Sequence, residues 1–195
     1  MKYYIDIKIL GDTEISLGFI WQKVYAQMHL ALVEQKNSEG LCRVGFAFPR
    51  YEELFPLGDT LRLFSYAKED LELLRVEEIL KNLLDYVKID EIKEVPNNVK
   101  NYATFSRKQF KYNSERLARR QAKRKGISFE EALKNYEEFD EEKKKSDNKL
   151  PYVNIDSLSS QNKMKVFVVK EISKEPKEGL FSTYGLSKTS TVPCF

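Results

Sequence analysis

Histidine is almost absent from this chain, which has one, His29, among its 195 residues. The two cysteines, Cys42 and Cys194, are far apart, and neither belongs to a Cys-x-x-Cys pair. A zinc site requires several closely spaced Cys and His ligands, and a disulfide framework requires paired cysteines, so neither is predicted. Unpaired thiols are typical of a reducing compartment. We therefore expect a cytoplasmic protein without a cofactor.

Long apolar runs are also missing. No stretch approaches the roughly 20 residues that span a bilayer. The first residues, MKYYIDIKILGD, contain Asp6 and no small-residue cleavage site, which argues against a signal peptide. Apolar residues make up 42% of the chain, which is enough to build a core. We expect a soluble protein without membrane association, built as one large domain or two small ones.

Several enzyme signatures are absent as well. Gly45, Gly58 and Gly126 are isolated, so neither a phosphate-binding loop nor a dinucleotide fingerprint is present. A serine-hydrolase elbow, Gly-x-Ser-x-Gly, does not occur. Asp, Glu and His show no spacing typical of metal ligands, so no metal site is predicted. These absences leave few reaction classes open.

Positive charge is concentrated in one segment. Between Arg107 and Lys125 there are nine Lys or Arg and one acid, Glu115, a balance of +8 in a chain whose net charge is +3. Asn113 or Ser114 can cap a helix, and Gly126 can end it, so a basic helix is predicted over about 113–125. Its cations share one face or lie beside it: Arg116, Arg119, Arg120, Lys123 and Arg124.

This basic helix has two interpretations. Most charge runs are solvated helix faces. Like charges one turn apart destabilise a helix, however, unless a polyanion neutralises them. The phosphate backbone of a nucleic acid is the obvious polyanion, so we predict nucleic-acid binding.

Residues 1–96 show the periodicities of a β-α-β-β-α-β unit. This order is the split βαβ pattern of ferredoxin-like, RRM-like domains. The aromatic-rich RNP1 octamer of RNA-binding RRMs is missing, so Phe46 and Phe48 are expected in the core. The predicted strands are 3–10, 41–48, 60–66 and 86–95, and the predicted helices are 16–35 and 70–84.

Residues 97–195 are predicted to form a second, α/β domain that carries the basic helix, so the fold class is α+β. A capping box, Ser128 to Glu131, starts another helix that extends to near Phe139. The run 137–148 alternates acids and bases without an apolar period and is expected to be exposed. Strands are predicted at 151–155, 164–172 and 181–186.

His29 is the sole candidate for a histidine base. It lies four residues after Tyr25, at the edge of the apolar stripe of the first helix, where a lone histidine is most often a packed core residue. Histidine is also the commonest general base. RNA supplies its own nucleophile, the 2′-hydroxyl beside the scissile phosphate, so a base and accurate positioning suffice without a metal.

Four stretches of sequence, in this order, resemble the type I-F CRISPR repeat-processing endoribonuclease family. They are MHLALVEQ from Met28, VGFAFP from Val44, SRKQ from Ser106 leading to NSERL, and YGLSK from Tyr184 with a later Val-Pro. The resemblance implies metal-independent cleavage of CRISPR precursor RNA at the base of each repeat hairpin. The hairpin would keep its whole contact with the basic helix after the cut, so we expect the enzyme to stay bound to the mature CRISPR RNA and to enter a type I-F surveillance complex with it.

The resemblance also implies residue roles. His29 would be the general base, Ser157 would hold the ribose, and Tyr184 would lie beside the histidine. Ser159 would point the same way as Ser157 on an extended chain, so the choice between the two serines stays open. Arg107 and Gln109 would contact base edges. Met164 would cover the terminal base pair, at a position where the family has an aromatic residue. Phosphates in the major groove would be contacted by the cations of the basic helix, Arg116, Arg119, Arg120, Lys123 and Arg124.

Two alternatives remain at this stage. One is a non-catalytic RNA hairpin-binding subunit of a ribonucleoprotein, which needs the basic helix but not His29. The other is a structural subunit whose basic helix pairs with an acidic protein face. RNA cleavage in the presence of a chelator would distinguish the endoribonuclease from both of these alternatives, because neither of them cuts RNA.

Overall fold

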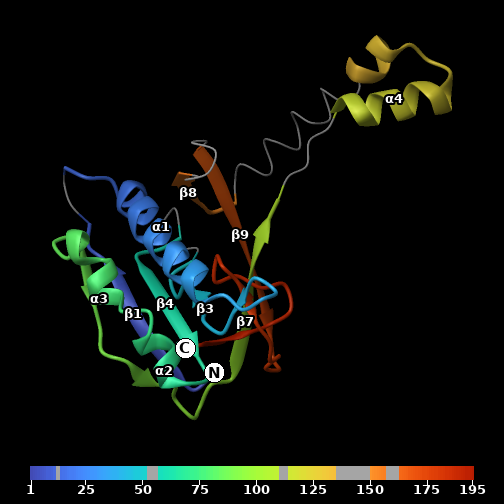
Figure 1. The fold of residues 1–195 in the computed structure, drawn as a ribbon. Coiled ribbons are helices and arrows are strands. Elements are labelled where there is room, and N and C mark those ends of the chain that lie inside the picture. Colours follow the sequence, from blue (N-terminus) through green and yellow to red (C-terminus); the bar gives the residue numbers. More distant parts are fainter. Residues whose placement is uncertain (12–13, 52–56, 110–113, 135–149, 157–162) are drawn as a thin grey trace. The chain divides into compact units, whose positions relative to one another are not determined.

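The computed structural model describes residues 1–11, 14–51, 57–109, 114–134, 150–156 and 163–195 (Figure 1). The chain forms two compact units, one made of Met1–Lys108 with Pro151–Phe195 and the other of Gln109–Leu150. This division differs from the boundary at residue 96 that the sequence suggested. Residues 101–108 and 151–195 supply a sheet that packs against the first helix, so they belong with the N-terminal part.

The N-terminal part of the larger unit has the β-α-β-β-α-β order predicted from the sequence. Its sheet is antiparallel in the order β3-β4-β1-β5, and β6 also pairs with β1. Placing the first strand between the third and the fourth is the arrangement of a ferredoxin-like unit. The elements are β1 (Tyr3–Ile9), α1 (Leu17–Gln35), β3 (Gly45–Ala47), β4 (Thr60–Ser65), α2 (Lys68–Glu72), α3 (Val76–Ile79), a 3-10 turn (Lys81–Leu83), β5 (Val87–Ile89) and β6 (Lys93–Glu94).

Three predicted elements are broken into shorter pieces. The expected helix 70–84 breaks at Arg75, which adopts a left-handed backbone with φ of 45°. In a continuous helix Val76 would point almost opposite to Leu74, whereas the break allows both side chains to be buried. The expected strand 86–95 becomes β5 and β6. The expected strand 41–48 becomes β3 and a separate β2 (Leu41–Cys42).

β2 leaves the first sheet in order to pair with a segment near the end of the chain. Its partner is β10 (Phe181–Ser182), which is much shorter than the strand expected at 181–186. A Cβ atom at Gly45 would lie 2.6 Å from the ring of Phe181, so a side chain at that position would displace the ring. The glycine in the Val-Gly-Phe stretch thus allows the C-terminal segment to approach β3.

A second antiparallel sheet completes the larger unit, in the order β11-β7-β9-β8. Val153, Val166, Val168 and Phe105 alternate along its strands and are buried, and β8 packs against α1. Phe46 and Phe48 lie in the same core, as predicted. The strands are β7 (Asn101–Lys108), β8 (Tyr152–Asp156), β9 (Lys163–Ser173) and β11 (Val192–Cys194).

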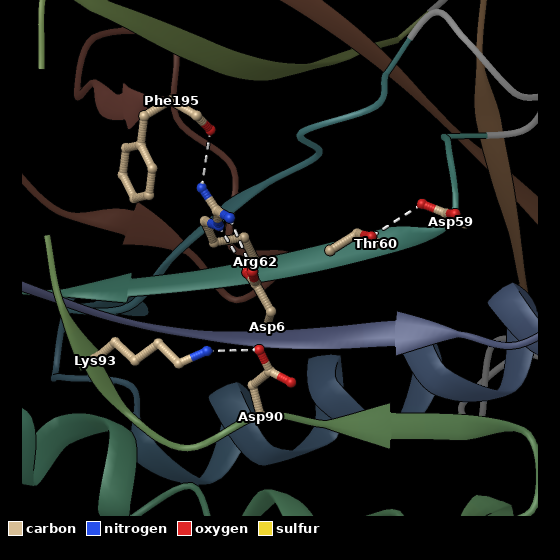
Figure 2. A network of polar contacts seen from close by, with 7 residues as sticks. All are labelled: Asp6, Asp59, Thr60, Arg62, Asp90, Lys93 and Phe195. Atoms are coloured by element: carbon tan, nitrogen blue, oxygen red, sulfur yellow. Dashed lines mark hydrogen bonds and ion pairs between the residues drawn. The ribbon is translucent and has the colours of Figure 1, made fainter. Parts of the chain in front are cut away.

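Arg62 joins the end of the chain to the first sheet (Figure 2). Its Nε and Nη2 donate hydrogen bonds of 2.6 and 2.8 Å to the carboxylate of Asp6, the residue opposite it on β1. Its Nη1 donates to the carbonyl oxygen of Phe195 at 3.1 Å. The guanidinium also lies 4.6 Å from the ring of Tyr4 and 4.3 Å from that of Phe195. These contacts hold the segment after β11 against β4.

The smaller unit contains the basic helix, α4 (Ser114–Lys125). Gly126 follows it with φ of 67°, the left-handed conformation typical of a helix end. The next helix begins at Phe129, and the Oγ of Ser128 accepts a hydrogen bond of 3.0 Å from the backbone N–H of Glu131, as the capping box predicted. The guanidinium of Arg119 lies 5.8 Å from the ring of Phe129, so the two helices are in contact.

Candidate active site

His29 lies on α1 and is half-buried. Its Nδ1 is 2.7 Å from the carbonyl oxygen of Thr183. A carbonyl oxygen can only accept a hydrogen bond, so Nδ1 carries the proton, and in the neutral ring the lone pair remains on Nε2. This tautomer is the one in which Nε2 can act as a base.

The ring of Tyr184 lies parallel to that of His29, with 4.3 Å between the centroids and 8° between the planes. Tyr25, one turn before His29 on α1, donates a hydrogen bond of 2.9 Å from its hydroxyl to the carbonyl oxygen of Tyr184. Burial, and to a lesser degree the neighbouring Tyr184, raise the pKa of the Tyr25 phenol well above its ordinary value, although Arg107 acts in the opposite direction. Tyr25 therefore remains a donor at every physiological pH.

The turn that carries Thr183 and Tyr184 is tied to two strands. Gly185 has φ of 70°, and a Cβ atom at this position would overlap the ring of Phe46. The carbonyl oxygen of Gly185 accepts a hydrogen bond of 2.7 Å from the N–H of Phe46, and the N–H of Ser187 donates to the carbonyl oxygen of Phe105 at 2.9 Å. These bonds to β3 and β7 hold the turn in place, so that the Thr183 carbonyl oxygen stays within hydrogen-bond distance of His29 Nδ1.

Arg107 and Met164 reach the same place from the second sheet. Arg107 is half-buried on β7, on the sheet face that also carries the buried Phe105. Its guanidinium carbon lies 4.8 Å from the centroid of the Tyr184 ring. Its Nη2 donates to the sulfur of Met164 at 3.0 Å. The structure thus brings together His29, Tyr184, Arg107 and Met164, all of which were singled out in the sequence.

The predicted serine is adjacent to a described contact but is not itself described. The carboxylate of Asp156, the last residue of β8, accepts a hydrogen bond of 2.8 Å from the side-chain amide of Gln22. Gln22 precedes His29 on α1 by two turns, about 10 Å along the helix axis. Ser157 and the alternative Ser159 lie outside the described residues.

The remaining predicted residues belong to the smaller unit. Gln109 is exposed. The cations of α4 are exposed on the side of the helix away from Ala118, which is fully buried. Among them, Arg119 lies 3.8 Å from the carboxylate of Glu115, one turn before it. The exposed set is Arg116, Arg119, Arg120, Lys123 and Arg124.

Three residues of this site were missed by sequence reasoning. Tyr25 and Gln22 act through hydrogen bonds to segments more than 130 residues away in the chain, and no local pattern reports such contacts. Thr183 acts through its backbone carbonyl, so its side chain carries no signal.

Among the described residues there is no group of three or more Cys, His, Asp or Glu that could hold a metal ion, and none of their helices is long and apolar enough to cross a membrane.

Comparison with known proteins gives one family. The family model of the CRISPR-associated protein Cas_Csy4 matches residues 4–195. The CRISPR-associated endonuclease Cas6/Csy4 of Escherichia coli (strain UTI89 / UPEC) is 34% identical over 196 residues, and that of Pseudomonas aeruginosa (strain UCBPP-PA14) is 34% identical over 197 residues. Each comparison covers 100% of this chain and 100% of the relative.

Solved structures were matched as well, and one of them aligns over nearly its whole length. It is described as a RAMP protein binding different RNA substrates, and the match covers 98% of this chain and 99% of that chain. The TM-score is 0.38 and the identity 12%, values too low to bear on fold or function.

Proposed function

Because the chain belongs to the Csy4 family of CRISPR-associated proteins, we propose that it is an endoribonuclease that cuts CRISPR precursor RNA at the base of each repeat hairpin. The observation that carries this proposal is the hydrogen bond from Nδ1 of His29 to the carbonyl oxygen of Thr183. It leaves Nε2 as the proton-accepting atom on a half-buried ring.

The proposed reaction uses the nucleophile that RNA itself provides. Nε2 of His29 takes the proton of the 2′-hydroxyl beside the scissile phosphate, and the 2′-oxygen forms a bond to phosphorus. The bond from phosphorus to the 5′-oxygen breaks, and that oxygen takes up a proton. The products are a 2′,3′-cyclic phosphate and a 5′-hydroxyl. Because the nucleophile is already next to the phosphate, no metal-bound hydroxide is required.

Two further residues complete the proposed centre. The ring of Tyr184, stacked on that of His29 at 4.3 Å, fixes the plane of the imidazole. Ser157 follows Asp156, whose carboxylate is bound to α1 through Gln22, and we assign Ser157 the role of holding the ribose. Ser159 is the alternative for this role.

The remaining residues are proposed to hold the hairpin. Arg107 and Gln109 would contact base edges in the lowest pairs of the stem, and Met164 would cover the terminal pair. The exposed cations of α4 would lie along the major groove, which in A-form RNA is deep and narrow and brings the phosphates of both strands close to an inserted helix.

The hairpin lies on one side of the cut and keeps these contacts afterwards. We therefore propose that the protein retains the mature CRISPR RNA and enters a type I-F surveillance complex with it.

Removal of metal ions tests the proposed function directly. We expect the protein, mixed with the repeat RNA of its host in excess EDTA, to produce one discrete cut at the base of the hairpin. The measurement is a denaturing gel of end-labelled RNA. Tight binding without a cut would instead support a non-catalytic hairpin-binding subunit, and a cut that EDTA abolishes would contradict the metal-independent mechanism.

The basic helix makes a separate prediction about salt. If each cation neutralises about one phosphate, the logarithm of the affinity should fall with the logarithm of the salt concentration with a slope of several units. Replacing Arg124 with alanine should weaken binding to all stems alike and reduce that slope by about one. Fluorescence anisotropy with an uncleavable RNA measures both quantities. Lys81, which is exposed in the larger unit, provides the control, because its replacement should leave the slope unchanged.

A further inference from the structure

Arg107 has an unusual set of contacts for a residue that is expected to bind RNA. Its guanidinium lies against the ring of Tyr184, and Tyr184 in turn lies against His29. The side chain is therefore packed into the catalytic centre of the protein. A residue whose sole task is to read a base has no need to contact the ring that holds the general base.

Among the residues that the structure describes, Arg107 has only weak hydrogen-bond partners. Nη2 donates to the sulfur of Met164, a weak acceptor. Nε is buried and has no hydrogen-bond partner among the described residues. A guanidinium forms its strongest hydrogen bonds with paired oxygen or nitrogen acceptors such as a phosphate or the edge of a guanine. Within the described part of the chain, packing holds Arg107, while its Nε has no acceptor and its Nη2 has a weak one.

We propose that Arg107 is a positioning residue that couples binding of the nucleotide at the cut to the alignment of His29. This inference rests on the proposed function. When that nucleotide offers its acceptors, the guanidinium is held between them and the sulfur of Met164, and it stays pressed against Tyr184. Tyr184 then holds the imidazole plane, so that Nε2 faces the 2′-hydroxyl. With a nucleotide that lacks suitable acceptors, Arg107 has weak partners and the Tyr184–His29 stack loses its support.

A variant at Met164 can distinguish two roles of this residue, anchoring Arg107 and covering the end of the stem. A leucine at 164 keeps an apolar surface of similar size but has no atom that accepts a hydrogen bond from Nη2 of Arg107. If Met164 only covers a base pair, its replacement by leucine changes little. If Met164 also anchors Arg107, the same replacement slows the cleavage step while affinity is kept.

The experiment compares affinity with the cleavage rate at saturating protein in single turnover. Affinity is measured with a repeat RNA whose attacking 2′-hydroxyl is replaced by hydrogen. We expect Arg107→Gln to slow the saturated cleavage step by about 10- to 100-fold, the size expected for a slightly misplaced reacting group. Tyr184→Leu should slow the same step, and the double variant should be no slower than the slower single variant, because both substitutions break one linkage.

Lys108→Gln is the matched control. Lys108 follows Arg107 on β7, is exposed and points to the opposite face of the sheet, so its replacement removes an equal charge without touching Tyr184. Its saturated rate should equal that of the wild type.

Two results would overturn the inference. One is an Arg107→Gln variant that regains the wild-type rate once protein is saturating, since Arg107 would then act in binding alone. The other is a double variant whose loss is the product of the two single losses. If Arg107→Gln does not fold, Met164→Leu carries the test, and an unchanged saturated rate for that variant would refute the coupling. An uncut wild-type reaction is distinct, because it would refute the proposed function itself.

Discussion

Replacing His29 with alanine is expected to slow cleavage by about 100-fold or more, the usual contribution of a general base. The hydrogen bond from Nδ1 to Thr183 prepares Nε2 to accept a proton, and alanine offers no atom that replaces it. The affinity for the hairpin should stay close to that of the wild type, since we propose that it depends mainly on the cations of α4. Single-turnover cleavage measures the rate, and anisotropy with uncleavable RNA measures the affinity.

Two serine variants accompany this experiment. Ser157→Ala should slow cleavage in the same way but to a lesser degree, because the role proposed for this hydroxyl is to position the ribose and not to take the proton. Ser159→Ala is its matched control, with the same change of side chain two residues later. A larger loss for Ser159→Ala would transfer the ribose-holding role to Ser159. An unfolded His29→Ala protein, seen by circular dichroism, would mean that the histidine is needed mainly for packing.

A single 2′-deoxy nucleotide immediately upstream of the scissile phosphate is expected to abolish cleavage. The substitution removes the one hydroxyl that is placed to attack that phosphorus, so no amount of enzyme can restore the reaction. Binding should remain nearly intact, because the stem and its phosphates are unchanged. With unmodified RNA, mass spectrometry of the upstream product should find a cyclic phosphate or its opened form.

The control RNA carries the same substitution one nucleotide further upstream. It has an identical number of hydroxyls but keeps the proposed nucleophile, so it should be cut at a rate near that of unmodified RNA. Cleavage of the first deoxy substrate would contradict attack by the 2′-hydroxyl, and it would imply that the protein activates a water molecule instead.

Much of the fold could be predicted because it follows from local patterns. The apolar spacing from Leu17 to Leu32 specifies an amphipathic helix, and α1 extends over Leu17–Gln35. The order of strands and helices in the first 96 residues was likewise correct. The breaks were not predicted, because they depend on which neighbours are present. β2 pairs with β10, which lies some 140 residues further along the chain, and nothing in Leu41–Phe48 records that partner.

The candidate site, like the fold, has some features that could be predicted from local sequence patterns and others that could not. By itself, the sequence determined the chemical capacity of this protein: one histidine, a cluster of cations with the period of a helix, and motifs in the order of a known family. Only the tertiary structure decided that the imidazole donates from Nδ1 to Thr183, that Tyr25 holds the turn of Tyr184, and that Arg107 packs against Tyr184. The physical reason is that residue types and their periodicity are local properties of the chain. The tautomer of His29 and the partners of Arg107 are set by a backbone carbonyl and an aromatic ring that folding brings from distant parts of the sequence.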